Sequence, residues 1–538
     1  MTTTPAAAHL ASSSQPTVIV GAGIAGLAAA LRLSAKGAAV LVLESHDGPG
    51  GKMRTLPSPA GPVDAGPTVL TMRDVFEDLF AAAGERLEDH VTLLRLGCIA
   101  RHFWSDGAQL DLFDDAGRNR EALAAFGGAR AVRQFERFGR RARALFEGFR
   151  APMIEAAEPT LPQLVRYMMV RPRLAWRMAP HQSLARLLRG SFDDPRLGQL
   201  FGRYATYVGG SPNGVPALLS LIWHAEMLGV WAVKGGMHRL AQAIERCAVA
   251  RGATFEYGAD VAQIVAPNGQ VEAVLLRDGR RVATRNVIFN GDPRALATAT
   301  MGRDCATVAP QTRDIPRSLS AEAWAFAAVA KGPELSYHNV FFRDDPAPEF
   351  AALSSGATPV SDPTIYVCAI DRAEAGTTRA LERFETIANA APLPPDTQTM
   401  TLEPKDTARC RIRTFQTLAR FGVSFTPMPE PAALTTPQGF NHLFPATAGS
   451  LYGQSPHGML APFQRPTART PIRGLYLAGG GTHPGAGIPM ATRSAKHAVE
   501  AMLSDQTSTS LSPQTATPGG MSTGSLTMAA APSPSSGS

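Results

Sequence analysis

The sequence has few cysteines, and none of them form the close pairs that bind metals or build disulfide frameworks. Five cysteines lie far apart in a chain of 538 residues, with no CxxC or CxxxC spacing. This pattern supports neither a zinc site nor a disulfide-stabilised fold, so we expect no bound metal and a cytoplasmic protein. The cysteines are Cys98, Cys247, Cys305, Cys368 and Cys410.

Long apolar runs and an N-terminal targeting signal are also missing. No stretch of about eighteen uncharged apolar residues occurs, so we expect no membrane-spanning helix. The N-terminus has no basic segment, and its longest apolar stretch, residues 6–11, is broken by His9, which argues against a signal peptide. Aromatic residues make up only 7% of the chain, so Ala, Leu and Val dominate the apolar set, as in a globular protein of several lobes.

Acidic residues are outnumbered by basic ones. The 52 lysines and arginines exceed the 45 acidic residues, which gives a net charge of +7. Such a surplus favours nucleic acid or an anionic membrane surface as a partner. The sequence contains no nucleic-acid-binding motif, so we expect a membrane surface and no nucleic acid.

The first feature that the chain does contain is a βαβ unit with a glycine turn. Residues 17–20 (TVIV) predict a buried strand, residues 27–36 a helix and residues 39–43 a second strand. GAGIAG stands between the first strand and the helix, with the spacing of a dinucleotide-binding turn. The same turn also closes strand–helix junctions that hold no ligand, but the full succession of strand, glycines, helix, strand and acid favours the dinucleotide.

Each residue of this unit has a chemical role in that interpretation. Gly21 permits the turn, Gly23 lets a diphosphate approach the backbone, and Gly26 allows helix and strand to pack closely. Glu44, at the end of the second strand, is placed to accept hydrogen bonds from an adenosine ribose and would repel a 2′-phosphate. The unit therefore predicts FAD or NAD and fits NADP poorly.

A second glycine turn separates these two cofactors. Gly50 and Gly51 precede the cationic side chains of Lys52 and Arg54. An NAD site does not need this turn, whereas FAD is longer and needs contacts for its diphosphate and flavin beyond the first loop. FAD is therefore the predicted cofactor.

Two segments in the first half of the chain are rich in arginine. Residues 131–149 predict a helix whose arginines are most simply a solvated face. Residues 162–190 carry arginines and no acidic residue, interleaved with Trp176 and with Met and Leu side chains. This pattern suits the boundary between anionic headgroups and acyl chains, but it also suits a pair of helices packed on the protein, and both interpretations stay open.

The second half of the chain predicts hairpin turns at Asn268–Gly269 and Asp278–Gly279, a sheet, and a returning nucleotide motif. Residues 323–330, 339–342 and 364–369 are apolar strands that we expect to form a sheet under a large apolar cavity. Residues 474–490 predict a strand that runs into a glycine-rich turn. A helix over residues 491–503 follows, and its N-terminus would face a flavin or a diphosphate.

Together these motifs resemble the bacterial carotenoid desaturases, FAD enzymes of the phytoene desaturase group in the amine-oxidase-like flavoprotein superfamily. The resemblance covers residues 17–503, and GTHPGAGIP near the C-terminus is its most specific part. Residues 337–342 (YHNVFF) resemble the branch that acts on hydroxylated or methoxylated neurosporene-type carotenoids, because phytoene desaturases more often show two histidines there. One departure is Gly474, where the family usually has Asn.

The resemblance implies an α/β fold, namely a Rossmann-like FAD-binding domain with an inserted α+β substrate domain and a helical membrane-associating region. The FAD-binding domain would comprise residues 16–71, 230–300 and 466–504. A combined substrate and helical, membrane-facing region would span residues 72–229 and the substrate domain residues 301–465, with disordered ends at residues 1–15 and 505–538.

The resemblance also implies a reaction and its partners. The expected enzyme introduces a C-3,4 double bond into an acyclic carotenoid, hydroxyneurosporene or methoxyneurosporene, by hydride transfer to the flavin. It would associate peripherally with the inner or photosynthetic membrane from the cytoplasm. Its electron acceptor, oxygen or a quinone, stays open.

The family's cofactor contacts carry over onto matching positions, whereas its catalytic residues are less defined. The sequence shows no evident Ser/His/Asp set or carboxylate pair, in keeping with a delocalised allylic cation that needs no strong base. Arg143 lies where the family has an arginine near the flavin, and His338 is a lone histidine, so both are catalytic candidates although a surface arginine and an edge histidine are simpler. The implied cofactor contacts are Gly21, Gly23 and Gly26 (diphosphate), Glu44 (ribose), Gly50, Gly51 and Lys52 (diphosphate side), Val261 (adenine), and Gly480, Ile488, Pro489 and Met490 (diphosphate and flavin).

Three other functions fit the sequence less well. A phytoene desaturase is the nearest. An amine or porphyrinogen oxidase shares the fold, but an amine oxidase would want aromatic walls beside the flavin, and aromatic residues are scarce here. A prenyl-binding escort protein of the GDP-dissociation-inhibitor type has lost flavin, which the intact glycines at residues 50–51 and 479–481 oppose.

Overall fold

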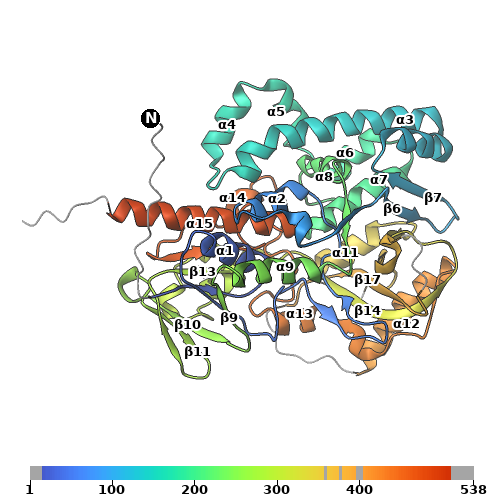
Figure 1. The fold of residues 1–538 in the computed structure, drawn as a ribbon. Coiled ribbons are helices and arrows are strands. Elements are labelled where there is room, and N and C mark those ends of the chain that lie inside the picture. The colour runs from blue at the N-terminus through green and yellow to red at the C-terminus, as the bar shows by residue number, and fades with distance from the viewer. Residues whose placement is uncertain (1–14, 357–359, 375–378, 395–403, 511–538) are drawn as a thin grey trace, which may run out of the picture.

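The computed structural model describes residues 15–356, 360–374, 379–394 and 404–510. Two large sheets and a layer of helices make up most of the molecule (Figure 1). The sheet that contains the N-terminal strand lies at the lower left of the view, the second sheet at the lower right, and helices from the first half of the chain cover the top. The expected disordered residues 1–14 and 511–538 lie outside the described residues.

The N-terminal strand β1 lies at the centre of a five-stranded parallel sheet. Its strands are short apolar runs because helices or loops cover both faces, which leaves no solvated side. Helix α1 packs against α9 and α15 over one face, so segments from both ends of the chain share one core. In sheet order, the strands are β20 (Leu475–Leu477), β13 (Val287–Phe289), β1 (Thr17–Val20), β2 (Val40–Leu43) and β9 (Thr254–Glu256), and the helices are α1 (Ile24–Ser34), α9 (His238–Val249) and α15 (Ile488–Ser510).

A small antiparallel sheet stands beside this one, with the turns that the sequence predicts. Asn268 and Gly269 connect its first two strands, and Asp278 and Gly279 connect the next two. Its strands are β10 (Val261–Val265), β11 (Ala273–Leu276) and β12 (Arg281–Ala283), and two further pairs are β3 (Thr55–Leu56) with β4 (Val63–Asp64) and β5 (Leu93–Arg95) with β8 (Trp231–Val233).

The three apolar strands predicted in the second half of the chain do form one sheet. The sheet also contains a long strand, β17, that the sequence did not indicate, and a hairpin from the first half of the chain, β6 and β7. The expected substrate sheet is therefore built from two distant segments. In sheet order, its strands are β18 (Ser424–Thr426), β14 (Ser320–Lys331), β17 (Glu382–Ala390), β16 (Ile365–Ala369), β15 (His338–Phe341), β6 (Cys98–Phe103) and β7 (Gln109–Phe113), with β19 (Leu434–Thr435) also paired to β14.

Helices from the first half of the chain form the upper layer of Figure 1. The predicted helix over residues 131–149 is the second half of a longer one, α3, which is kinked where Gly127 and Gly128 leave helical geometry. No helix in the described part of the chain has the length and apolar character needed to span a bilayer. From the upper layer and from the rest of the molecule, the remaining α-helices of the described residues are α2 (Arg73–Ala81), α3 (Ala116–Phe149), α4 (Leu161–Met169), α5 (Pro172–Met178), α6 (Leu184–Ser191), α7 (Pro195–Gly202), α8 (Ile222–Met227), α10 (Pro293–Ala297), α11 (Ala347–Ser355), α12 (Pro404–Arg420), α13 (Pro437–Leu443) and α14 (Ala461–Gln464).

The last helix corrects the expectation of a disordered tail that begins at residue 505. Helix α15 continues to Ser510, so residues 505–510 are helical. Asp505 accepts hydrogen bonds from the Arg469 guanidinium and from the Tyr476 hydroxyl, which ties this end of the helix to the sheet. Composition alone did not reveal these contacts, because both partners lie about thirty residues earlier in the chain.

Gly474, the departure from the family pattern, sits at a position where space and backbone both restrict the side chain. Its φ is +83°, and a Cβ there would lie 2.0 Å from the carbonyl oxygen of Arg285. We expect Gly474→Ala to lower stability by about 2–4 kcal/mol, the sum of left-handed strain and overpacking. Gly107 has the same φ with open space around it, so Gly107→Ala should cost only about 1 kcal/mol. Thermal unfolding of both variants tests this, and equal losses would contradict the steric account.

Candidate cofactor and substrate site

One large cavity connects the two sheets and the helical layer. Its volume is about 1310 Å³, above the range of about 300–1,000 Å³ that is usual for small-ligand pockets. The turn after β1, the end of β2, the start of α15 and one face of the second sheet all contribute to its wall. Space of this size accommodates a dinucleotide together with a second, elongated ligand.

The first glycine turn forms a cradle at one end of the cavity that side chains would fill. A Cβ on Gly23 would lie 2.8 Å from the Asn290 side-chain nitrogen, and one on Gly26 would lie 2.0 Å from the Gly21 carbonyl oxygen. Gly23 caps α1 without a side-chain hydrogen bond, so the first N–H groups of the helix are free to bind an anion. Gly21 and Gly23 line the cavity, and Gly26 permits the packing behind them.

The second glycine turn lies directly against the first. The Gly50 N–H donates to the Ala22 carbonyl at 2.9 Å, and a Cβ on Gly51 would lie 3.0 Å from the Gly23 Cα. Both glycines have positive φ and both line the cavity. The predicted pair of turns is thus one continuous backbone surface, a shape that suits a diphosphate.

Glu44 is fixed at the end of β2, where the sequence placed the ribose contact. One carboxylate oxygen accepts from the Ala22 N–H at 2.6 Å, and the other accepts from the His46 N–H at 3.0 Å. Burial raises the pKa of Glu44, but the hydrogen bonds from His46 and Ala22 outweigh it and hold the pKa below its ordinary value. The group is therefore an ionised acceptor on the cavity wall, and Val261 lines the same region.

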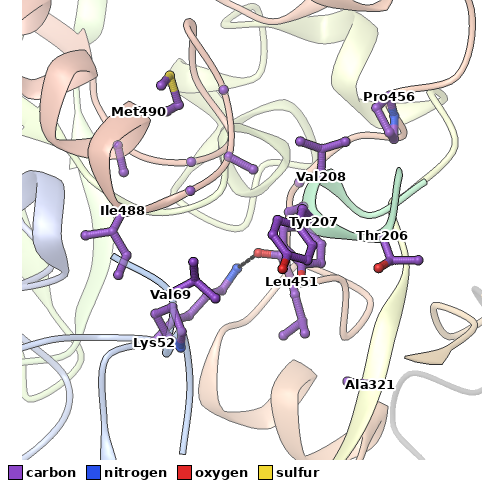
Figure 2. Close-up of a pocket in the computed structure, with 18 of the residues that line it drawn as sticks. Lys52, Val69, Thr206, Tyr207, Val208, Ala321, Leu451, Pro456, Ile488 and Met490 are labelled. Atoms are coloured by element: carbon purple, nitrogen blue, oxygen red, sulfur yellow. Dashed lines mark hydrogen bonds between the residues drawn. The ribbon is translucent and has the colours of Figure 1, made fainter. Parts of the chain in front are cut away.

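The C-terminal motif supplies the opposite wall of the cradle. Gly480, Ile488, Pro489 and Met490 line the cavity, where the N-terminus of α15 begins. Figure 2 shows Ile488 and Met490 on the same side of the cavity as the start of this helix. The sequence prediction that both ends of the chain build the site is reproduced in this geometry.

Lys52 contributes a buried cation to the cavity. Its Nζ donates to the Leu451 carbonyl at 2.6 Å (Figure 2). Burial lowers its pKa to about 8, opposed by the carboxylate of Asp292, while Arg317 and Arg465 lower it further. The side chain still carries a proton at neutral pH and favours an electron-rich ligand edge.

The far part of the cavity is lined by one face of the second sheet. Strand side chains alternate between faces, and the cavity face of β14 carries alanines, which leave room above the sheet. Phe146, Phe149 and Met153 from the helical layer lie across the cavity. The lining positions on the sheet are Ala321 and Ala323 (β14), Glu385, Ile387 and Asn389 (β17), Tyr366 (β16) and Val340 (β15).

Neither of the two catalytic candidates is among the described residues that line the cavity, and Arg143 has the surface position that was the simpler interpretation of the sequence. Arg143 is 67% exposed on α3, pairs with Glu147 and is not among the described residues that line the cavity, so the expected arginine near the flavin is not this one. His338 is buried behind the cavity wall, where its Nδ1 lies 2.6 Å from the Tyr366 hydroxyl. Burial lowers the pKa of His338 to about 3, so the ring is neutral.

Several polar groups of the cavity were not identified from the sequence. Tyr366 also contacts the Thr68 hydroxyl at 2.6 Å, and on the helical wall Arg203 lies 3.6 Å from the Glu226 carboxylate. Burial raises the pKa of Glu385 well above its ordinary value, and Asp64 adds to the shift, so both favour the protonated carboxyl. An acid within the strand ERFETIANA was the available signal, but the strand itself was not predicted.

These residues fit FAD. The joined glycine turns leave a side-chain-free cradle at an uncapped helix N-terminus, the chemistry that a diphosphate requires. Glu44 offers ionised oxygens for ribose hydroxyls, and the start of α15 with Lys52 offers donors along the remaining length. Bound FAD would leave the sheet face and its alanines for a second ligand.

The role of Glu44 can be tested by replacing its side chain. We expect Glu44→Ala to weaken FAD binding by about tenfold to a hundredfold, because the ribose contact and the anchor of Ala22 are both lost. Glu256→Ala is the control, since Glu256 lies on the neighbouring strand β9 and pairs with Arg280 at the surface. Fluorescence titration of flavin-depleted protein measures both affinities, and equal values would contradict the assignment.

Comparisons with known proteins agree with this geometry. The family model described as flavin containing amine oxidoreductase matches residues 24–503. The hydroxyneurosporene desaturase of Cereibacter sphaeroides is 51% identical over 92% of this chain and 98% of its own, and that of Rhodobacter capsulatus is 48% identical over 92% and 99%. A solved oxidoreductase from Methanosarcina mazei shares the fold, with a TM-score of 0.59 and 15% identity over 90% of this chain and 100% of its own. The chain belongs to the flavin-containing amine oxidoreductase family, within its carotenoid desaturase group, and its cofactor is FAD.

Proposed function

We propose that this enzyme introduces a C-3,4 double bond into an acyclic, oxygenated carotenoid of the hydroxyneurosporene or methoxyneurosporene type. The observation that carries the proposal is the cavity, which runs from the glycine cradle to an alanine-lined sheet face. A long, flexible polyene has few polar groups, so an apolar channel that ends at the flavin is the main requirement. The identity with the hydroxyneurosporene desaturases supports the choice within the carotenoids.

The chain's own residues bind and orient the substrate in this reaction. Desaturation removes a hydride and a proton from neighbouring carbons, and bound FAD supplies the hydride acceptor. The sheet face and the helical wall hold the polyene in register with the cradle and exclude water. The cofactor contacts proposed here are the twelve positions expected from the sequence, from Gly21 to Met490, with the same division into FAD-binding, substrate and helical segments.

We also propose that helices α4 and α5 rest on an anionic membrane surface. Met169 and Trp176 are 78% and 79% exposed there, although both are large apolar side chains. The inner side of the pair packs on Phe149, which itself lines the cavity, so lipid contact would lie close to the apolar end of the cavity. The exposed apolar set is Leu161, Val165, Met169, Val170 and Trp176, beside the basic residues Arg166, Arg171, Arg173 and Arg177.

A phytoene desaturase is the alternative within the same group. The cavity wall carries the hydroxyls of Thr68 and Tyr366 and the carboxyl of Glu385, polar groups with which an all-hydrocarbon substrate cannot pair. We therefore favour an oxygenated substrate. The electron acceptor would be either oxygen or a quinone.

The substrate proposal predicts a selective spectral change. The FAD-loaded protein should shift the absorption of hydroxyneurosporene in liposomes to longer wavelength, because the conjugated system lengthens. Phytoene in matched liposomes should not change, and protein without FAD should act on neither. Conversion of phytoene but not of hydroxyneurosporene would refute the proposal.

The membrane proposal predicts a loss of vesicle binding from a paired substitution. Met169→Ser with Trp176→Ser should lower partition onto phosphatidylglycerol-containing vesicles by about tenfold or more, since buried apolar area drives such binding. Val249→Ser with Ile412→Ser removes two exposed apolar side chains elsewhere and serves as the control. Co-sedimentation measures both, and an equal effect of the two pairs would contradict the assigned face.

A further inference from the structure

Three side chains at the cavity wall form a short hydrogen-bonded chain. The neutral ring of His338 lies 2.6 Å from the Tyr366 hydroxyl through Nδ1, and Tyr366 lies 2.6 Å from the Thr68 hydroxyl. Tyr366 and Thr68 line the cavity, whereas His338 is buried behind them. The chain therefore leads from the protein interior to the substrate space.

The proton arrangement of this chain follows from the environment of His338. Its Nε2 is buried and has no hydrogen-bond partner among the described residues. A proton on Nε2 would be a buried donor without an acceptor, whereas a proton on Nδ1 donates to the Tyr366 oxygen and leaves only an unpaired acceptor at Nε2. The Nδ1–H form is the less costly one.

This form leaves one hydroxyl proton over. His338, Tyr366 and Thr68 then hold three donors, but only two contacts join them, and another neighbour of the Tyr366 hydroxyl is the sulfur of Cys368, which is a weak acceptor. If Tyr366 donates to Thr68, the Thr68 hydroxyl is free to donate into the cavity. If Thr68 donates to Tyr366, the free proton is that of Tyr366.

We propose that Thr68 and Tyr366, with His338 as a positioning residue, donate a hydrogen bond to the terminal oxygen of the carotenoid. The inference rests on the proposed function. A C-3,4 double bond forms within a few bonds of an oxygen on the end group, so that oxygen must lie near the reacting carbons. A free donor pairs with a hydroxyl and equally with an ether oxygen, which explains how one site serves hydroxylated and methoxylated substrates.

Charge on the facing walls is compatible with this arrangement. Arg203 on the helical side disfavours a second proton on His338 and so keeps the ring neutral. The neighbouring strand places Ile387 opposite Tyr366 in the sheet, so the tyrosine ring rests against an apolar side chain. Its hydroxyl shares this part of the sheet face with the carboxyl of Glu385, which lines the same cavity.

The test compares two substrates that differ only in the oxygen. We measure kcat/KM for hydroxyneurosporene and for its oxygen-free parent neurosporene in liposomes and take the ratio. Thr68→Val together with Tyr366→Phe should lower this ratio at least tenfold, because the cavity then offers no hydroxyl donor to the substrate oxygen, a contact that neurosporene does not make. Tyr257→Phe removes a hydroxyl that contacts Glu245 and is not among the described residues that line the cavity, so it should leave the ratio unchanged.

Variants of His338 separate positioning from packing. His338→Asn keeps an amide N–H close to the place of Nδ1 and should retain most of the preference, whereas His338→Leu should lose it. The wild-type enzyme should prefer a methoxylated substrate over neurosporene, just as it should prefer the hydroxylated one. A preference for hydroxyl but not methoxyl would show that the pair accepts rather than donates and would overturn the proposal.

Failure of the inference differs from failure of the proposed function. A folded, flavin-loaded double variant, Thr68→Val with Tyr366→Phe, that keeps an unchanged ratio would overturn the inference while the desaturase function stands. So would a wild-type enzyme that turns over hydroxyneurosporene and neurosporene equally well. A wild-type enzyme that turns over no oxygenated carotenoid would refute the proposed function, and the inference with it.

Discussion

The contact between the two glycine turns is the constraint on which the cofactor end of the molecule depends. The Gly50 N–H binds the Ala22 carbonyl, and the backbones of Gly23 and Gly51 approach so closely that a Cβ would barely fit. Any side chain here would either fill the cradle or push the second turn away from it. The same contact fixes the path of the chain from Glu44 to Lys52, so the ribose acceptor and the buried cation stand at opposite ends of one surface.

The substrate end depends on a different physical feature, the alternation of side chains along β14. Ala321 and Ala323 face the cavity, whereas Trp324 and Phe326 face the opposite side and pack into an aromatic core. Small residues on one face create space, and large residues on the other make the sheet rigid. Space for a long apolar molecule therefore exists above one face of the sheet, and the strands do not have to separate to create it.

Local pattern was enough for the elements whose signals lie within a few residues. The βαβ unit, the turns at Asn268–Gly269 and Asp278–Gly279, and the C-terminal glycine motif all appear in the structure as expected. Strand β17 was missed because ERFETIANA mixes charged and apolar residues without clear alternation. Arg143 is exposed, as the simpler interpretation of a basic helix had it, whereas its position along the family pattern did not reveal which side of α3 faces solvent.

The sequence by itself determined the cofactor and the class of enzyme, because glycine spacing, strand patterns and the terminal acid act within short segments. Only the tertiary structure decided which side chains meet. Thr68, His338 and Tyr366 lie up to 298 residues apart and share one hydrogen-bonded chain because β15, β16 and the loop after β4 converge at the cavity. Such contacts depend on strand register and sheet order, which no local pattern in the chain encodes.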